Sequence, residues 1–168
     1  MSKRQLIEFD EKLTDEAEAL NQYLYQYRDS IRKKNILERR REEIRNEFNH
    51  PLQGVSYDGM PHSCGVSVGS AAISYRLDEI DMKIADQIGK AQRLLIDIMN
   101  VIDFLDEKEY DLSRCIIENR YIDRMSWEKI GKENHASKSK VCRNWKKGLY
   151  RLLEFKKVQE ILKEYMNE

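Results

Sequence analysis

Apolar residues in the first hundred positions recur at alternating spacings of three and four, and this pattern leaves few folds open. In residues 6–31 the repeat comprises Leu6, Phe9, Leu13, Ala17, Leu20, Leu24, Tyr27 and Ile31. In residues 77–105 it comprises Leu77, Ile80, Ile84, Ile88, Ala91, Leu95, Ile98, Ile102 and Leu105. Such spacing places the apolar side chains on one face of an α-helix and is typical of coiled-coil seams. The sequence therefore predicts two long helices, the second over about residues 71–105.

The composition favours an all-α protein. Charged residues make up 36% of the 168 residues, and the only prolines are Pro51 and Pro61. That combination is typical of long helices with solvated faces rather than sheets. Both prolines and four of the seven glycines lie in residues 50–70, where we predict a loop. Two seams joined by one loop predict a long antiparallel, coiled-coil-like hairpin over residues 1–105, whose helices are also expected to form a homodimer.

Residues 110–153 have the pattern of a helix-turn-helix. An apolar first helix over residues 112–122 ends at Asp123 and Arg124, and a short second helix follows over residues 126–134. A tight corner at His135 and Ala136 then leads into a third helix opened by Ser137. Gly131 is expected where the second and third helices cross, because a larger side chain would push them apart. We predict a domain over residues 106–168 whose C-terminal helical extension is either continuous or broken near Glu154.

The third helix of this motif is cationic although the chain as a whole is neutral. Lys and Arg total 30, as do Asp and Glu, yet residues 138–153 hold six Lys or Arg and no acidic residue. A cationic helix of this kind is typical of recognition helices in the DNA major groove. The alternative is a structural three-helix bundle with a solvated basic face.

Individual roles follow from the residue types on this helix. The hydroxyl of Ser137 is expected to cap the helix, whose amides and dipole then favour a phosphate. Arg143 is predicted to pair with guanine and Asn144 with adenine, while Ser139 adds a polar group to the same face. Phosphate contacts are predicted for Lys138, Lys140, Lys146, Lys147 and Arg151. Trp127 is expected to pack at the opening of the motif.

Residues 114–131 and 136–141 resemble region 4 of bacterial sigma factors, the part that binds the promoter −35 element. The whole layout is similar to small phage-encoded late-gene transcriptional regulators of the ArpU and RinA type: a charged first helix, a loop containing Gly59 to His62 and Gly65, a second long helix and this C-terminal part. The resemblance implies a phage or prophage origin, double-stranded DNA and bacterial RNA polymerase as partners, and a role in switching on late, packaging or lysis genes. Nothing resembles sigma region 2, so an autonomous sigma factor is not expected.

Other classes of protein receive no support from the sequence. We find no nucleophile–base set, no phosphate-binding glycine loop and no helical HExxH, so we expect neither an enzyme nor a cofactor. His50, Asp58, His62 and Cys64 match no zinc spacing, and no metal is expected. No apolar run approaches the ~18 residues of a membrane span, the N-terminus lacks a signal-peptide core, and three cysteines lack CxxC spacing. These features predict a cytoplasmic protein with reduced thiols and no membrane segment.

The leading hypothesis is a sequence-specific transcriptional regulator. Two alternatives remain open at this stage. One is a DNA-packaging adaptor similar to small terminase subunits, which combine a helix-turn-helix with oligomerising helices in rings. The other is an interaction module that binds polymerase or a repressor and does not contact DNA.

Overall fold

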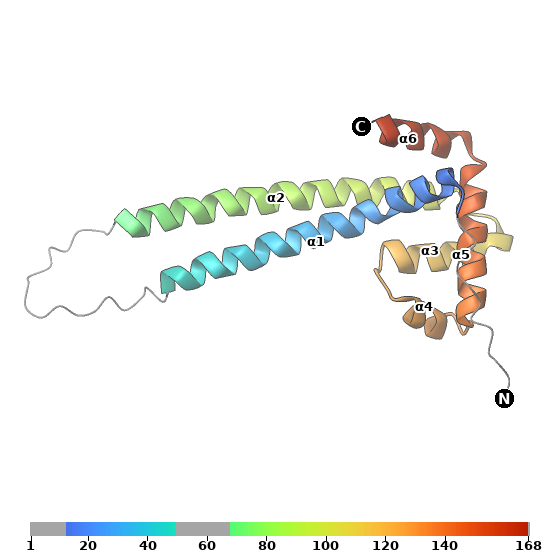
Figure 1. The fold of residues 1–168 in the computed structure, drawn as a ribbon, viewed down its shortest axis with the longest axis horizontal. Coiled ribbons are helices and arrows are strands. Elements are labelled where there is room, and N and C mark those ends of the chain that lie inside the picture. The colour runs from blue at the N-terminus through green and yellow to red at the C-terminus, as the bar shows by residue number, and fades with distance from the viewer. Residues whose placement is uncertain (1–12, 50–67, 168) are drawn as a thin grey trace, which may run out of the picture. The chain divides into compact units, whose positions relative to one another are not determined.

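The computed structural model describes residues 13–49 and 68–167, and every regular element in these ranges is helical (Figure 1). The all-α prediction is therefore confirmed. The elements are α1 (Asp15–Asn49), α2 (Val68–Ile102), the short 3-10 helix η1 (Lys108–Tyr110), α3 (Asp111–Tyr121), α4 (Trp127–Glu133), α5 (Lys138–Leu153) and α6 (Lys156–Asn167). The second long helix thus begins at Val68 and ends at Ile102, a few residues earlier at each end than the apolar pattern indicates. Residues 50–67 of the predicted loop lie outside the described ranges.

The described chain divides into two compact units. The first contains the residues up to Arg28 and those from Arg93 onward, and the second contains residues 29–49 and 68–92. The first part of α1 therefore belongs to the same unit as α3, α4, α5 and α6. The domain boundary predicted near residue 105 differs from this division, because it assigns the first part of α1 to the same domain as the rest of the two long helices.

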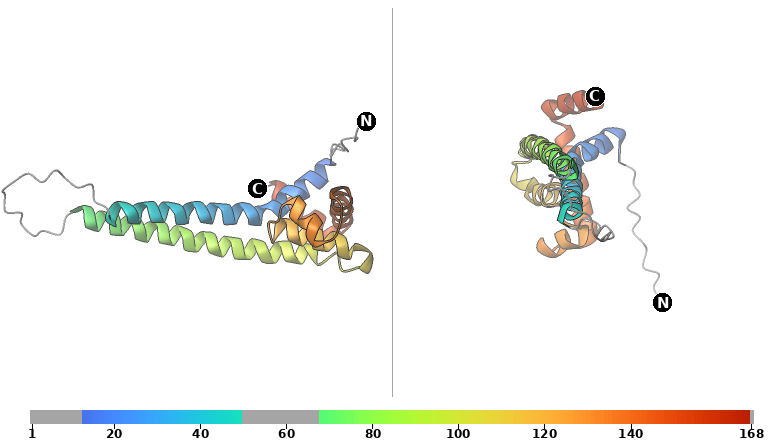
Figure 2. Two further views of the ribbon diagram at one scale, coloured as in Figure 1. Left: turned by 90° about the horizontal axis from the view of Figure 1, so that it is seen from below. Right: turned by 90° about the vertical axis from the view of Figure 1, so that its left-hand side faces the viewer.

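In the second unit, α1 and α2 lie side by side (Figure 2). The side chain of Gln87 donates to the hydroxyl of Ser30 at 2.5 Å, and Arg41 donates to Asp81 at 3.1 Å. The residue numbers rise along α1 as they fall along α2, so the two segments run in opposite directions. Ser30 is buried, and its hydroxyl gives Gln87 an inward-facing partner.

The predicted inward position of Ile88 in the α2 seam is wrong. Ile88 is 38% exposed, whereas Ile80 and Ala91 of the same seam are buried. The physical reason is that the adjacent Gln87 turns toward Ser30 to form its hydrogen bond. Because consecutive residues on a helix point about 100° apart, an inward Gln87 turns Ile88 toward solvent.

The first unit has the larger apolar core, to which α1, α2, α3, α5 and α6 all contribute. Its most buried members are Leu20, Leu24, Ile98, Val101, Ile102, Leu105, Ile117, Tyr121, Leu149, Leu152, Val158 and Leu162. Burial of each aliphatic side chain stabilises the fold by about 1.5–3 kcal/mol relative to exposure. Val158 and Leu162 belong to α6. The helix is therefore interrupted between Leu153 and Lys156, and α6 folds back onto this core.

Polar side chains inside the first unit connect α1 to the C-terminal helices. The hydroxyl of Tyr121 donates to the amide oxygen of Asn21 at 2.7 Å and accepts from the indole N–H of Trp145 at 2.9 Å. Tyr121 is fully buried, and burial raises the pKa of its hydroxyl far above the ordinary value. Arg120 donates to the hydroxyl of Tyr25 at 2.9 Å. These bonds fix the start of α1 against α3 and α5.

Candidate nucleic-acid interface

Helices α3, α4 and α5 enclose a small apolar cluster of their own. Ile116, Ile130 and Val141 are buried, and partly buried side chains surround them, among them Leu112, Met125, Trp127, Ala136 and Trp145. The rings of Trp127 and Trp145 meet edge to face with centroids 5.4 Å apart. This contact confirms the predicted packing role of Trp127.

The corner between α4 and α5 follows the predicted pattern. His135 adopts a φ of 46°, in the left-handed region that L-residues other than glycine rarely occupy. The amide of Ala136 donates to the carbonyl of Gly131 at 2.9 Å. The Ser137 hydroxyl then accepts from the amide of Lys140 at 3.3 Å, so the predicted N-cap of α5 is confirmed.

Two glycines allow the three helices to approach closely. A Cβ on Gly131 would lie 3.0 Å from the carbonyl oxygen of Ala136, which agrees with the predicted need for a small residue there. A Cβ on Gly148 would lie 2.7 Å from Cδ1 of Ile117 and 3.1 Å from Cβ of Ser113. Gly148 therefore marks where α5 crosses α3. Sequence reasoning missed it, although it shares the inward face with Val141 and Trp145.

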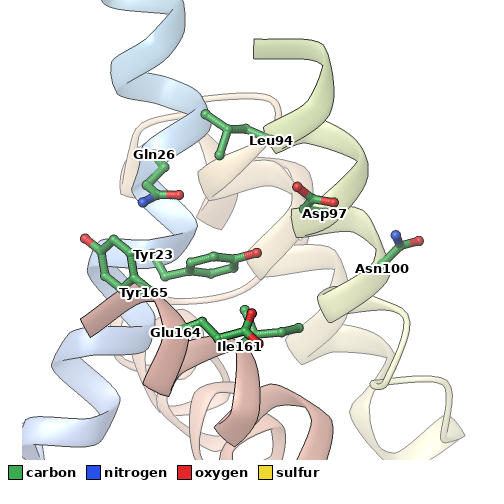
Figure 3. A pocket seen from close by; sticks show the side chains of 8 residues that line it. All are labelled: Tyr23, Gln26, Leu94, Asp97, Asn100, Ile161, Glu164 and Tyr165. Atoms are coloured by element: carbon green, nitrogen blue, oxygen red, sulfur yellow. The ribbon is translucent and has the colours of Figure 1, made fainter. Parts of the chain in front are cut away.

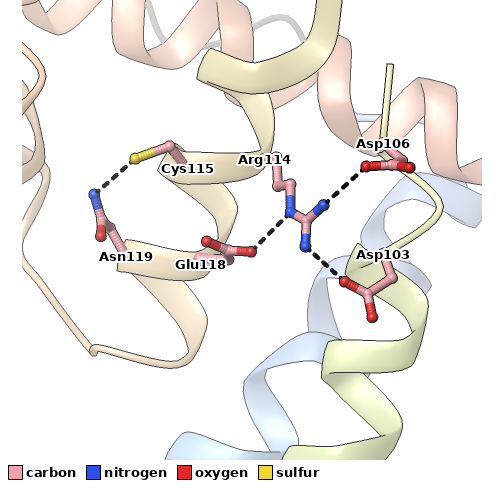
Figure 4. Close-up of polar contacts among 6 residues, drawn as sticks. All are labelled: Asp103, Asp106, Arg114, Cys115, Glu118 and Asn119. Carbon is pink, nitrogen blue, oxygen red and sulfur yellow. Dashed lines mark hydrogen bonds and ion pairs between the residues drawn. The ribbon is translucent and has the colours of Figure 1, made fainter. Parts of the chain in front are cut away.

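The polar atoms of Asn134, which follows α4, are satisfied internally. Its amide nitrogen donates to the carbonyl of Ile130 at 2.9 Å, and its amide oxygen lies 3.3 Å from the sulfur of Cys115. Asn119 approaches the same sulfur at 3.6 Å (Figure 4). Burial raises the pKa of the Cys115 thiol, which favours its protonated form. The cluster therefore joins α3 to the end of α4 through hydrogen bonds.

Arg114 holds the start of α3 to the segment that follows α2. Its guanidinium lies 2.6 Å from Asp103, 3.6 Å from Asp106 and 3.0 Å from Glu118 (Figure 4). The hydrogen bond to Glu118 and the surrounding negative charges raise the pKa of Arg114. This cation is therefore occupied in orienting α3 and is not part of the cationic face of α5.

The predicted DNA-contacting residues distribute unevenly around α5. Val141, Gly148, Leu149 and Leu152 are buried, which directs Arg143 and Lys147 outward, one helical turn apart. Among the predicted set, the exposed residues are Ser137, Lys138, Lys140, Arg143 and Lys147, and the partly buried residues are Ser139, Asn144, Lys146 and Arg151. The amide nitrogen of Asn144 donates to the carbonyl of Lys140 at 2.9 Å, which ties this side chain to its own helix.

Lys147 and Arg151 already have carboxylate partners. The ammonium of Lys147 lies 2.6 Å from Glu109 and 4.6 Å from the ring centroid of Tyr110. Arg151 pairs with Glu107 at 2.5 Å and also with Glu154. The hydrogen bond to Lys147 lowers the pKa of Glu109, and the same bond raises the pKa of Lys147. No pattern in the sequence indicates this pairing, because Glu109 lies 38 positions before Lys147 in a segment that has only the features of a polar junction.

Other site types find no support in the described ranges. No group of three or more His, Cys, Asp or Glu within residues 13–49 and 68–167 is arranged to hold a metal ion. His50, Asp58, His62 and Cys64 lie outside these ranges, whereas Cys115 and Cys142 are free thiols. None of the helices that the structure describes is both long and apolar enough to cross a membrane.

Comparison with known proteins yields no relative. No family model matches the chain, and neither the curated proteins nor the solved structures contain a significant match.

Proposed function

We propose that this chain is a sequence-specific DNA-binding transcriptional regulator of the phage type, with α3, α4 and α5 as a helix-turn-helix similar to sigma region 4. In this proposal α5 enters the major groove at a promoter, where the protein acts together with RNA polymerase. The observation that carries the proposal is the outward face of α5, where Lys140 and Arg143 are exposed on a helix without an acidic residue. Such a face favours duplex phosphates and base edges.

The geometry around α5 supports the same proposal. The left-handed corner at His135 and the cap at Ser137 direct the N-terminal turn of α5 away from α4, and its exposed amides suit a phosphate. Arg143 is the residue best placed to read a base, because its fork of donors matches the O6 and N7 acceptors of guanine. The same helix carries the residues that we predict to contact phosphates or to add polar groups: Lys138, Ser139, Lys140 and Lys146.

We further propose that the long helices form an antiparallel hairpin that presents a surface for a protein partner. In the second unit, Tyr75 is 75% exposed and Met82 is 71% exposed, seven residues apart on α2. Apolar side chains at this spacing lie on one helix face, which suits a second copy of the chain or a surface of RNA polymerase. The same exposed residues favour the alternative of an interaction module that does not bind DNA.

The first experiment selects bound sequences from a random pool of duplexes and then compares variants on the selected site. Arg143→Ala should relax the preference at one base pair, with a loss of about 1–3 kcal/mol on the preferred site. Lys140→Ala should weaken binding to all duplexes alike. It should also reduce the salt dependence, since the slope of log K against log salt concentration is about −0.9 for each phosphate neutralised. Lys163→Ala, an exposed cation on α6, is the matched control and should change neither property.

Three outcomes would count against the proposal. An Arg143→Ala variant with unchanged affinity and the same preferred site would refute the assignment of α5. Light scattering that gives the mass of a ring of many copies would favour a DNA-packaging adaptor instead. Retention of RNA polymerase in a pull-down, together with no shift of any duplex, would favour the interaction module.

A further inference from the structure

A cavity of about 400 Å³ opens between α1, α2 and α6 in the first unit, away from the predicted DNA-contacting residues of α5 (Figure 3). This volume lies at the lower end of the range for small-molecule sites and far exceeds that of a bare metal ion. Leu94 and Ile161 supply apolar surface to the lining. The cavity therefore has room for a short carbon chain carrying one polar head group.

The charged groups that line the cavity are all negative. Asp97 projects from α2 and Glu164 from α6, and no Lys or Arg is among the lining residues. Among the described residues neither carboxylate has a cationic partner, unlike the paired carboxylates near α5. Gln26 and Asn100 add amide oxygens, which also accept hydrogen bonds. The lining thus offers negative charge and acceptors to whatever enters.

A nearly buried tyrosine side chain gives a second, independent indication of a ligand. Tyr23 is only 8% exposed, and Figure 3 shows its ring reaching into the cavity from α1. Within the described residues its hydroxyl makes no hydrogen bond, so a side chain that is nine-tenths buried leaves its hydroxyl available to an occupant of the cavity. Burial and the charge of Asp97 both raise the pKa of Tyr23, which keeps the hydroxyl neutral.

Two aromatic rings complete the lining. Tyr23 and Tyr165 meet edge to face with centroids 5.7 Å apart. Aromatic faces attract ammonium and guanidinium groups, and carboxylates on either side strengthen that attraction. An anion would meet two unpaired carboxylates here, and a purely apolar ligand would leave the Tyr23 hydroxyl unsatisfied.

We propose that this cavity binds an organic cation, a guanidinium or alkylammonium group on a short apolar stem. The cationic head group would lie between Asp97 and Glu164, where it can only donate hydrogen bonds. The apolar stem would pack on Leu94 and Ile161. The same chemistry occurs in an arginine side chain of a partner protein and in a free small molecule. The proposal is independent of the proposed function, because none of the lining residues belongs to α5.

The test titrates butylguanidinium into the full-length protein and follows amide and tyrosine-ring resonances by NMR. We expect saturable shifts at Tyr23 and Tyr165 with a dissociation constant roughly in the millimolar range, as befits so small a ligand. Pentanamide, a neutral molecule of similar size, should produce none of these shifts. If butylguanidinium leaves both tyrosines unmoved, or if pentanamide shifts them equally, the proposal is overturned.

Variants separate a built site from general attraction to an acidic surface. Asp97→Asn and Glu164→Gln each exchange an exposed carboxylate for an amide of the same shape, and each should weaken butylguanidinium binding about three- to tenfold. Glu160→Gln, an exposed α6 carboxylate outside the lining, is the matched control. Equal weakening by all three variants would contradict a specific site. Circular dichroism confirms that each variant remains folded.

A final comparison identifies the source of the cation. Agmatine represents a free small molecule with two cationic ends, and N-acetyl-arginine-N-methylamide represents an arginine side chain of a protein. Tighter binding of agmatine supports a small-molecule ligand, and tighter binding of the blocked arginine supports a protein partner. Failure of both to bind would overturn the proposal. A mobility-shift assay with duplex DNA should be unaffected by Asp97→Asn, so the two proposals fail or succeed separately.

Discussion

Replacement of Gly148 by alanine sets two opposing effects against each other in one helix. Alanine is about 0.8–1.0 kcal/mol more favourable than glycine inside a helix, so propensity alone predicts a more stable protein. The new Cβ, however, would lie 2.7 Å from Cδ1 of Ile117 and 3.1 Å from Cβ of Ser113. Both neighbours are fully buried, and Cβ of Ser113 is fixed by the backbone of α3, so neither can easily yield.

The destabilisation caused by the close contact is expected to exceed the stabilisation from the higher helix propensity of alanine. Overpacking of a well-packed core costs roughly 1–3 kcal/mol, which leaves a net loss of about 1 kcal/mol after the gain in propensity. For a protein of this length that loss lowers the melting temperature by about 2–4 °C. Thermal and urea unfolding followed by circular dichroism measure the change.

A matched control comes from the middle of α2. Apart from the neighbouring residues and backbone of α2 itself, no atom of the described residues lies within 4 Å of a Cβ added to Gly89, so Gly89→Ala should stabilise its unit through helix propensity by about 1 kcal/mol. Trimming Ile117 to valine removes the Cδ1 atom and should therefore cost less in the Gly148→Ala background than in the wild type. A Gly148→Ala protein as stabilised as the Gly89→Ala protein would refute the close crossing of α3 and α5.

Three further perturbations test other contacts. Glu109→Gln should release Lys147 and tighten DNA binding about two- to fivefold in a mobility-shift assay; the same gain with Glu128→Gln, an exposed α4 carboxylate, would indicate only a change in overall charge. Tyr121→Phe should lower the free energy of unfolding by about 1–3 kcal/mol, because the indole N–H of Trp145 loses its buried acceptor, and an unchanged urea midpoint would contradict this network. His135→Gly should raise the free energy of unfolding by about 0.5–1 kcal/mol, since relief of the left-handed backbone exceeds the added chain entropy, and a loss of stability would argue against the corner.

Local features of the fold could be predicted from the sequence because their causes are local. The cap at Ser137 depends on the three residues that follow it, and the corner at His135 depends on the end of one helix and the start of the next. Apolar periodicity likewise identified the helices themselves. Ile88 shows the limit of this reasoning: its apolar character fitted the seam, but Gln87 gained a buried hydrogen bond with Ser30 on the other helix.

Pairings between distant residues could not be predicted, because no short-range pattern encodes them. Glu109 and Lys147 belong to different elements, and nothing in either segment indicates that a predicted phosphate contact already has a carboxylate partner. Gly148 carried a usable signal, since a glycine on the inward face of a helix marks a close crossing. The assignment of Arg143 and its neighbours to DNA remains a prediction from the charge of α5.

The position of the first α1 turns in the core has a consequence for how the protein is made. Asn21 and Tyr121 are bonded partners 100 positions apart, and Leu20 and Leu24 share a core with Leu162. On the ribosome, residues 13–28 are synthesised before the helices that cover them. Their apolar side chains are buried only after α3, α5 and α6 have also been synthesised. During this interval the apolar side chains of residues 13–28 lack the partners that cover them in the folded protein. Translation stalled just before α6 should therefore yield a protease-sensitive start of α1 that becomes resistant once α6 has been synthesised and has emerged.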